Sequence, residues 1–403
     1  MNSSARVNRI LISNYRSIAK CDLKLGQLVF LVGPNGSGKS NFLDAMRLVS
    51  DALQSSLDHA LRDRGGINEV RRRSSGHPTH LGVRIEFQLP TRELGHYAFR
   101  IGAKKNGSFL VQGEECWLLS EKTRSFRVEE GVRRDKDGSV IRKGLPEDRL
   151  HLVAASSEPE FRPVFELLAN MAFYSLNPDR MRELQTPDAG ELLHRDGGNA
   201  ASVLRRLADA FPENRKRIQD YLALVVPGVL EVEHKVIGPK ETISFKQEVA
   251  GAKSPWNFLA ANMSDGTLRA LGILLGLFQK SEVHSPSLIG IEEPEIALHP
   301  AAAAALLDAL REASQDRQTI VTSHSPDLLD LVDPDREGII AVNAEQGTTK
   351  IAPIDAASKE TLRAGLYTPG ELLRLNQLEP DPILLQALEG KKQLALFDLG
   401  NTR

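Results

Sequence analysis

The chain has 403 residues, of which 41% are hydrophobic and 26% charged, a composition that is typical of a folded globular protein and excludes a disordered one. The length allows two or three domains, or one large α/β unit with insertions. The net charge of −2 excludes a chain that is basic throughout, as many nucleic-acid binders are, but allows a local basic patch.

The cysteine content and the hydropathy of the chain indicate in which cellular compartment the protein is expected. Cys21 and Cys116 are too few for a disulfide framework and lie in apolar contexts, so we expect buried thiols. The N-terminus lacks the apolar core of a secretory signal, and no apolar run approaches the ~18 residues that a spanning helix needs. We therefore expect a cytoplasmic protein with no membrane partner.

The chain begins with a strand–loop–helix pattern. Residues 9–15 and 27–32 are expected to be strands, and the second is apolar throughout, as in the middle of a sheet. A glycine-rich loop follows. Residues 41–57 then carry apolar side chains at helical spacing.

The next stretch, residues 62–80, is irregular and basic, with five arginines against two acids. It fits either a solvated loop or a loop that faces phosphate or nucleic acid, because clustered arginines attract backbone phosphates. Arg62–Arg73 is the best candidate for a DNA contact. Residues 81–142 change to short alternating runs, which indicate an antiparallel sheet.

The remaining pattern alternates between helices and buried strands. Helical spacing covers residues 156–225, interrupted at Asn177–Arg180 and at Gly197–Gly198, and residues 231–249 resemble a strand hairpin. Further helices are expected at residues 267–279, 300–314 and 327–331, and buried strands at 288–291 and 319–322. The tail is expected to hold a strand pair and one or two helices.

Residues 33–40 match the pattern G-x-x-x-x-G-K-[ST] of a phosphate-binding loop (P-loop), between a buried strand and an amphipathic helix. Glycines let backbone N–H groups surround phosphate oxygens, and the helix N-terminus adds positive potential. The lysine supplies a charge to the β- and γ-phosphates, and the last serine a Mg²⁺ ligand. The candidate nucleotide-binding residues here are Gly33, Pro34, Asn35, Gly36, Ser37, Gly38, Lys39, Ser40 and the adjacent Asn41.

Two acids follow the buried strand at residues 288–291, where ligands bind in open α/β sheets. One carboxylate can hold Mg²⁺, and the next can orient or deprotonate the attacking water. We assign these two roles to Glu292 and Glu293, in this order.

Two further stretches are ambiguous when each is considered alone. Ser264 or Asp265 could be an ordinary helix N-cap, or Ser264 and Gly266 could form a second anion site at the start of a helix. His324 ends a buried strand, where it could be structural or could reach a γ-phosphate.

Together, four stretches resemble a known family. GPNGSGKSN, NMSDGT, IGIEEPE and TSHS are similar to the Walker A, signature, Walker B and switch-histidine motifs of ABC-type ATPases, in the spelling of the SMC/RecF/OLD branch. The early Asn14-Tyr15-Arg16-Ser17 also resembles the first strand of that branch. The resemblance implies an α/β fold, namely an ATPase head with a mixed or parallel central sheet, an antiparallel β-subdomain and an inserted helical subdomain.

The resemblance also implies a dimer around two ATP molecules. Ser264 and Gly266 of one subunit would contact the γ-phosphate held by Lys39 of the other. Ser40 and Glu292 would bind Mg²⁺, Glu293 would be the catalytic base, and His324 would sense the γ-phosphate. Two more residues differ in type from the family pattern. Asn177 is a candidate for the Q-loop, where the usual Gln is missing. His299 stands where many relatives carry Asp.

The expected organisation has five segments. They are an N-terminal core part with the P-loop (1–61), a basic loop and β-subdomain (62–155), a helical Q-loop-like insertion (156–250), a C-terminal core part (251–345) and a final strand with helices (346–403). Residues 333–338 (DPDREG) resemble part of a Toprim nuclease site, but their place after a helix favours a loop. We expect no Toprim domain and no long coiled-coil arm.

Three functions remain open. The first is ATP hydrolysis with ATP-dependent dimerisation, coupled to DNA or an effector protein in DNA repair or phage defence. The second is a slow-turnover ATP-binding scaffold or sensor that holds a nuclease or toxin partner. A transporter subunit is the third, but NMSDGT is not the LSGGQ-type signature that such subunits normally carry.

Overall fold

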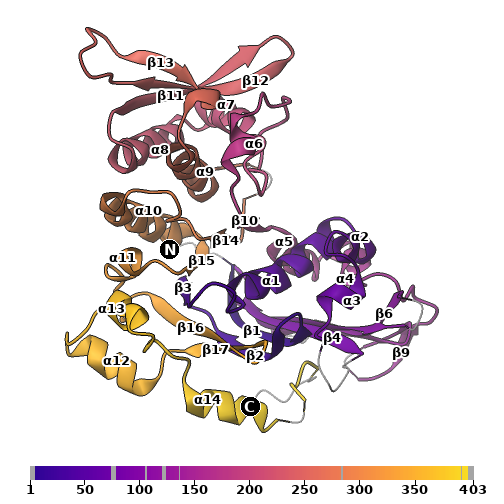
Figure 1. Ribbon diagram of the computed structural model, residues 1–403. Coiled ribbons are helices and arrows are strands. Elements are labelled where there is room, and N and C mark those ends of the chain that lie inside the picture. The colour runs from indigo at the N-terminus through magenta and orange to yellow at the C-terminus, as the bar shows by residue number, and fades with distance from the viewer. Residues whose placement is uncertain are drawn as a thin grey trace. The chain divides into compact units, whose positions relative to one another are not determined.

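The computed structural model describes residues 5–73, 79–104, 107–119, 124–135, 137–282, 285–391 and 393–397. The chain packs into two compact units (Figure 1). Unit 1 comprises Met1–Met171, Gly338–Thr361 and Leu378–Arg403, and unit 2 comprises Ala172–Glu337 and Leu362–Gln377. These units cut across the five expected segments, because strands from both ends of the chain share the sheet of unit 1.

Unit 1 is built on a mixed sheet with the strand order β3-β16-β17-β2-β1-β4-β5-β6-β7-β8-β9. β16 is parallel to β3 and β17 is parallel to β2, whereas all other neighbours are antiparallel. The strands are β1 (Arg6–Tyr15), β2 (Ile18–Lys24), β3 (Leu28–Val32), β4 (His80–Gln88), β5 (Leu94–Ala103), β6 (Phe109–Leu119), β7 (Arg124–Glu129), β8 (Val132–Arg134), β9 (Val140–Arg142), β16 (Gly338–Glu345) and β17 (Thr348–Pro353).

The antiparallel sheet expected at residues 81–142 is confirmed by β4 to β9. Because β4 pairs with β1, these strands continue the sheet of β1 and β2 and do not form a sheet of their own. The apolar run of β3 is fully buried, as its composition predicts.

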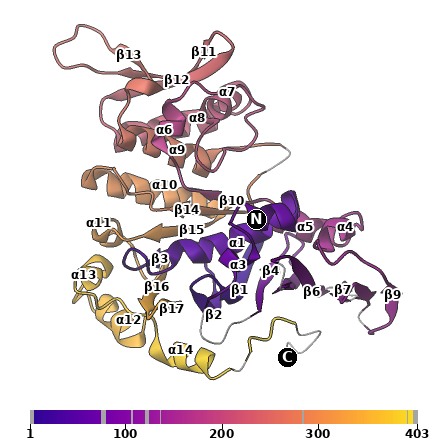
Figure 2. The ribbon, with the colours of Figure 1, turned by 45° about the vertical axis from the view of Figure 1, so that its right-hand side comes forward.

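The helices of unit 1 are α1 (Lys39–Gln54), α2 (Leu57–Arg62), α3 (Ile67–Val70), α4 (Leu152–Ala155), α5 (Arg162–Ala169) and α14 (Pro382–Glu389). α12 (Ala356–Arg363) crosses the boundary between the units. The first helix ends three residues earlier than its apolar spacing predicts, because the side chain of Ser56 accepts a hydrogen bond from His59 N and caps α2. α1 and α14 cover opposite faces of the sheet (Figures 1 and 2).

Unit 2 contributes two groups of strands. Strands β10 (Met171–Tyr174), β14 (Leu288–Glu292) and β15 (Gln318–Ser323) are neighbours in this order, and β14 and β15 are parallel. A separate antiparallel sheet holds β11 (Val229–Ile237), β12 (Lys240–Gln247) and β13 (Trp256–Leu259). The hairpin expected at residues 231–249 is therefore confirmed.

The helical structure expected within residues 156–225, outside its two interruptions, is wrong at β10. Its four residues, Met-Ala-Phe-Tyr, form a run too short for periodicity to separate strand from helix. Position in the sheet, not local pattern, decides the conformation here. The Q-loop candidate Asn177 lies three residues after the end of this strand.

The helices of unit 2 are α6 (Pro178–Arg182), α7 (Ala200–Ala210), α8 (Pro212–Val225), α9 (Asp265–Phe278), α10 (Ala303–Asp316), α11 (Pro326–Leu329) and α13 (Pro369–Arg374), with short 3₁₀ turns η1 (Ala260–Asn262) and η2 (Pro300–Ala302). α9 is buried along most of its length. Two of its glycines permit close packing, since a Cβ on Gly272 would lie 2.8 Å from Leu176 Cδ1 and one on Gly276 would lie 3.1 Å from Tyr174 Cδ2.

Both cysteines are buried free thiols, as expected. Burial raises the pKa of each thiol well above its usual range, so both stay protonated at neutral pH. Among the described helices, none combines the length and the hydropathy that crossing a bilayer requires.

Candidate functional site

The P-loop joins β3 to α1, and its glycines are needed for its shape. Gly36 and Gly38 have φ values of +78° and +107°, in the region that favours glycine. A Cβ on Gly33 would lie 1.9 Å from Val342 O, and one on Gly38 would lie 2.0 Å from Thr349 Oγ1. The loop therefore lies directly against β16 and β17, with no room for larger residues.

Lys39 is held inside this loop. Its Nζ donates to Gly33 O at 2.8 Å and to Pro34 O at 3.0 Å, and the residue is only 5% exposed. Ser40, at the second position of α1, is exposed. The first N–H groups of a helix have no partners within it, so the start of α1 provides donors and positive potential beside the ammonium group.

Ser37 supplies a further sign that the loop is built for a ligand. Its Oγ is buried and has no hydrogen-bond partner among the described residues. A buried hydroxyl without a partner costs free energy unless something else satisfies it. Phosphate oxygens would do so, and the P-loop residues therefore fit the nucleotide expected from the sequence.

A hydrogen-bonded brace behind the loop was missed at the sequence level. Thr349 Oγ1 donates to Ser37 O at 2.9 Å and lies 2.7 Å from Ser17 Oγ, which accepts from Asn41 Nδ2 at 2.6 Å. The brace joins β17, the β1–β2 turn and α1. Thr349 is more than 300 positions from the loop in sequence, and no local pattern marks it.

Asp44 on α1 is the centre of a second support. Its carboxylate accepts Tyr15 Oη at 2.7 Å and pairs with Arg16 and Arg64, each at 3.0 Å. Tyr15 is fully buried, and burial, followed by the charge of Asp44, raises its pKa well above the usual range. The Asn14–Ser17 stretch thus anchors the helix that begins at the P-loop.

We expect Asp44→Ala to destabilise the protein by about 2–3 kcal/mol, because it removes one of the two carboxylates that pair with the buried guanidinium of Arg64, leaving Asp51, and also removes the carboxylate that accepts the Tyr15 hydroxyl. Thermal unfolding measures the effect. Asp58→Ala removes only an exposed pair with Arg62 and serves as the control, with an expected change of under about 1 kcal/mol. Equal losses in the two variants would contradict the role of Asp44.

The two acids after β14 adopt different conformations. Glu292 is the last residue of the strand and faces Thr322 of β15 in the parallel register. Glu293 turns away with φ +45°, and its N–H donates to Thr322 O at 3.0 Å. A positive φ in a residue other than glycine is strained and persists where the surroundings enforce it.

Glu293 and His324 are brought together at this strand edge. His324 Nδ1 lies 3.1 Å from Glu293 Oε1, and both side chains are partly exposed. The carboxylate is therefore oriented by an imidazole yet open to water. This is the arrangement that a general base needs, with a partner that can stabilise its charge.

Glu295 fixes the histidine's backbone, a role that the sequence did not reveal. Its Oε1 accepts Ser323 Oγ at 2.7 Å and His324 N at 3.2 Å. Burial raises the pKa of this carboxyl, while the hydrogen bonds from Ser323 and His324 oppose the rise. Only its spacing two residues after Glu293 could have marked it.

Glu292 has an unforeseen partner within unit 2. Arg195 Nη2 lies 3.1 Å from Glu292 Oε1, and the main-chain oxygen of Arg195 accepts Ser175 N at 3.0 Å. The candidate metal ligand thus carries a compensating cation. Ser40, the other candidate magnesium ligand, belongs to unit 1.

The signature-like stretch at Ser264–Gly266 caps α9 and packs closely against the segment that follows Glu295. Ser264 Oγ accepts Thr267 N at 3.2 Å at the start of α9, and Ser264 is exposed. A Cβ on Gly266 would lie 2.3 Å from Ala297 O, and Ala297 itself has φ +64°. Gly266 is therefore packed against the segment after Glu295, so the two motifs are structurally coupled.

The two residues that depart from the family pattern make local contacts. Asn177 Oδ1 accepts Asp179 N at 2.9 Å and caps α6, and His299 Nδ1 accepts Ala301 N at 3.2 Å and caps η2. Both are exposed. Their functional roles stay predictions.

A family model described as "AAA domain, putative AbiEii toxin, Type IV TA system" matches residues 28–330, about three quarters of the chain. The chain belongs to this AAA family. It is also similar to the OLD nuclease of Thermus scotoductus. The two aligned sequences are 26% identical over 426 residues, and the match covers 93% of this chain and 75% of the relative.

Solved structures show the fold of this AAA-family chain. A structure of an SMC head bound to the C-terminal winged-helix domain of ScpA matches with a TM-score of 0.56 at 14% identity, over 88% of this chain and 99% of that one. An SMC head with an extended coiled coil, bound to the C-terminal domain of ScpA from Pyrococcus furiosus, matches with a TM-score of 0.54 at 12% identity, over 90% and 99%. The predicted resemblance to the SMC/RecF/OLD branch is confirmed.

The basic stretch of this AAA protein is largely engaged within unit 1. Arg64 is buried between Asp44 and Asp51, and Arg72 donates to Ser17 O and Thr348 Oγ1. The remaining arginines pair within their own helices or turns: Arg62 with Asp58, Arg71 with Asn68 and Arg73 with Glu69. The solvated-loop interpretation is therefore wrong for Arg64, which is buried, and for residues 67–70, which form α3. A DNA contact through the exposed arginines stays a prediction.

Residues 333–337 form a turn before β16, which begins at Gly338, so the loop that the sequence context favours is confirmed. Glu337 is buried and pairs with Arg311 at 2.9 Å, and its other oxygen accepts Asp333 N at 2.7 Å. These acids stabilise the turn. Across the described residues, no group of three or more His, Cys, Asp or Glu side chains could hold a metal by itself.

Proposed function

We propose that the chain binds ATP with magnesium and hydrolyses it to ADP and phosphate. The observation that carries this proposal is the Glu293–His324 contact at 3.1 Å, at the edge of a two-stranded parallel ladder. A P-loop alone would support only binding. A partly exposed carboxylate, oriented by a histidine and set at the end of a strand, supports turnover.

The P-loop residues would hold the triphosphate. Lys39 would exchange its bonds to Gly33 O and Pro34 O for bonds to the β- and γ-phosphates. The N–H groups at the start of α1 and the hydroxyl of Ser37 would donate to the same oxygens. Ser40 and Glu292 would hold Mg²⁺, which supplies charge stabilisation to the transferred phosphoryl group.

Glu293 would accept the proton of the attacking water. Its Oε1 is within hydrogen-bond distance of His324 Nδ1, so an N–H at that position would orient the carboxylate toward the water. Glu295 would keep His324 in place through the backbone. His324 would also sense the γ-phosphate. Because its ring contacts Glu293, a shift of the ring would move the carboxylate of the base.

We further propose that two copies form a composite site. Ser264 is exposed at the N-terminus of α9, a 14-residue helix, and its hydroxyl contacts only Thr267 among the described residues. The γ-phosphate bound to Lys39 of one copy would complete this N-terminus in the other. ATP would then stabilise the dimer and hydrolysis would release it.

Complementation between two inactive variants tests the composite site. Lys39→Ala and Ser264→Arg should each be inactive alone. Mixed in equal amounts they should recover about a quarter of the wild-type rate of phosphate release, since half of the dimers are mixed and one of their two sites is intact. If every site were formed within one chain, the mixture would stay inactive.

The output would be conformational and directed at DNA or at an effector protein, in repair or defence. An OLD nuclease and SMC heads bound to ScpA are among the similar proteins, which supports an effector protein. The internal pairing of the basic stretch weakens the case for DNA contact there. Stimulation of hydrolysis by DNA would favour DNA, and ATP-dependent binding of a purified effector would favour a protein partner.

One observation favours the alternative of a slow-turnover ATP sensor. Glu292 is paired with Arg195, so the metal ligand must first be released. We expect Arg195→Ala to lower the Mg²⁺ concentration needed for half-maximal ATP binding by roughly twofold to fivefold, the range for a partly exposed ion pair. Titration of Mg²⁺ with fluorescent ATP in a Glu293→Gln background measures this without turnover.

Arg180→Ala is the matched control for this titration. Arg180 lies on α6 and pairs with Glu183 at 3.2 Å and with Asp196, the neighbour of Arg195, at 3.7 Å. Its removal should leave the Mg²⁺ dependence unchanged. If Arg195→Ala instead raised the Mg²⁺ requirement, the arginine would be supporting the site and the pair would not restrain it.

A further inference from the structure

Arg182, the last residue of α6, contacts the signature-like stretch on both sides of Ser264. Its Nη2 donates to Met263 O, the carbonyl oxygen just before the serine, at 3.1 Å, and its Nε donates to the same oxygen at 3.4 Å. The guanidinium also pairs with Asp265, the residue just after the serine. One side chain therefore holds the chain immediately before and immediately after the N-cap of α9.

The helix that carries Arg182 is anchored on α9. Met181, the preceding residue, is fully buried, and a Cβ on Gly272 of α9 would lie 3.2 Å from Met181 Sδ. Leu176, just before the N-cap residue of α6, meets the same glycine, since that Cβ would lie 2.8 Å from Leu176 Cδ1. Close packing of this kind leaves α6 little room to shift. Arg182 therefore reaches the start of α9 from a fixed position on the side of that helix.

Asp265 is the reason why a cation is needed at this helix end. It is the first residue of α9, where a carboxylate interacts favourably with the helix dipole. The same carboxylate would repel a phosphate that approached the helix end, because both groups are negatively charged. Arg182 offsets this charge and also pairs with Asp179 at 2.7 Å. Without Arg182, the two acids would lose the cation that they share.

The exposure of the pair indicates where its charge balance matters. The side chain of Arg182 is 26% exposed and that of Asp265 is 61% exposed. A pair so open to water contributes little to the stability of a single chain. When another surface covers the pair and excludes water, the interaction between the charges becomes stronger. The charges beside Ser264 therefore matter most at an interface.

We propose that Arg182 is a positioning residue of the composite site. It holds Ser264 and the first N–H groups of α9 in place and neutralises Asp265, so that this helix end can receive the γ-phosphate bound to Lys39 of another copy. The inference rests on the composite site proposed above and names a residue that acts on it through Ser264, without contact with the nucleotide. The residues that Arg182 holds lie 81 and 83 positions later in the chain, so no local pattern marks it.

Arg182→Ala in the Glu293→Gln background should weaken the Mg-ATP-dependent dimer by roughly tenfold to a hundredfold, the range for the loss of hydrogen bonds to a charged group. Light scattering over a concentration series measures this. The affinity of the single chain for ATP should not change, because the P-loop belongs to unit 1. Titration with fluorescent ATP, below the concentration at which dimers form, measures it. An unchanged dimer affinity, or weaker ATP binding by the single chain, overturns the inference.

Complementation shows which side of the composite site carries the defect. Mixed with Lys39→Ala, Arg182→Ala should recover about as much phosphate release as Ser264→Arg does in the same mixture, because Lys39 of one chain then faces an intact α9 of the other. Mixed with Ser264→Arg, it should gain nothing. If only the Ser264→Arg mixture recovers activity, the role of Arg182 is overturned while the composite site stands. If neither mixture recovers activity, the composite site itself fails, and the inference fails with it.

A double variant separates the charge of Arg182 from its contact with the backbone. Arg182→Ala/Asp265→Asn removes the repelling carboxylate together with its cation, so it should form the dimer roughly twofold to fivefold more tightly than Arg182→Ala, the range for a partly exposed pair. The difference between the two variants should shrink at high salt, because screening weakens the repulsion. Equal dimer affinities of the two variants at low salt overturn the neutralisation of Asp265.

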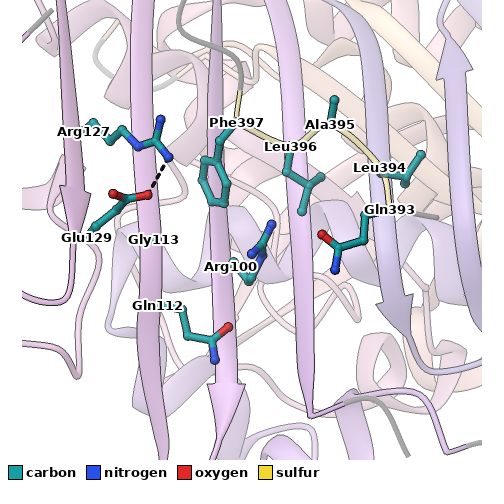
Figure 3. Close-up of a pocket in the computed structure, with 10 residues that line it drawn as sticks. All are labelled: Arg100, Gln112, Gly113, Arg127, Glu129, Gln393, Leu394, Ala395, Leu396 and Phe397. Carbon is teal, nitrogen blue, oxygen red and sulfur yellow. Dashed lines mark hydrogen bonds and ion pairs between the residues drawn. The ribbon is translucent and has the colours of Figure 1, made fainter. Parts of the chain in front are cut away.

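Arg127→Ala is the matched control from unit 1. The side chain of Arg127 is 29% exposed, close to the value for Arg182, and it also pairs with an exposed acid, Glu129 (Figure 3). Its removal should leave the Mg-ATP-dependent dimer unchanged, and thermal unfolding separates a loss of the dimer from a loss of fold. Arg182→Gln is a second form of the test, should Arg182→Ala fail to fold. An equal loss of dimer affinity in folded Arg127→Ala overturns the specific role of Arg182.

Discussion

Replacing Lys39 with alanine is expected to weaken the binding of ATP by about a hundredfold, because charge-assisted hydrogen bonds to phosphate are each worth about 1.5–3 kcal/mol. No other lysine lies in the P-loop, and the start of α1 offers only partial charge in its place. Isothermal titration with ATP and Mg²⁺ measures the loss.

Lys24→Ala is the matched control for this change. Lys24 ends β2 in the same unit and is exposed, so its removal should leave the affinity unchanged. Thermal unfolding of both variants separates a loss of binding from a loss of fold, since Lys39 also bonds to Gly33 O and Pro34 O. Retained ATP affinity in a folded Lys39→Ala protein would contradict the assignment of the P-loop.

Replacing Glu293 with glutamine is expected to lower the rate of ATP hydrolysis by about 10²–10⁴-fold, the usual contribution of a general base. The amide keeps the size of the side chain but cannot accept the proton of the attacking water. ATP affinity should change little, because the triphosphate would be held by the P-loop. Phosphate release in single-turnover experiments measures the step directly.

Glu312→Gln on α10 controls for a general effect of removing a carboxylate from unit 2, since Glu312 pairs only with Arg217 and Tyr221 among the described residues. Its turnover should equal that of the wild type. Should Glu293→Gln hydrolyse ATP at the wild-type rate, another group must act as the base, and the contact with His324 would be structural only.

The sequence predicted those parts of the candidate site whose residues lie next to one another along the chain. The P-loop could be placed because its glycines, lysine and serine follow one another between a buried strand and a helix. Glu292, Glu293 and His324 could be placed because each follows a short buried strand. These motifs combine a residue type with a strand or helix end, and both are visible in a single sequence.

The partners of these residues could not be predicted, because they are distant in sequence. Thr349 reaches the P-loop from β17, and Arg195 reaches Glu292 from a loop 97 positions earlier. Arg64 appeared to belong to a basic surface, yet the structure buries it against Asp44. β10 looked helical because four apolar residues carry no period. In each case, contacts between residues distant in sequence determine the partner, the burial or the conformation.

We expect ATP to join two copies at a site that contains Glu293. The most direct test is light scattering on Glu293→Gln, which should trap the bound state, with and without Mg-ATP. We predict a single-chain mass without nucleotide and a twofold rise with Mg-ATP, abolished by adding Lys39→Ala. A mass that does not change when Mg-ATP binds would contradict the composite site.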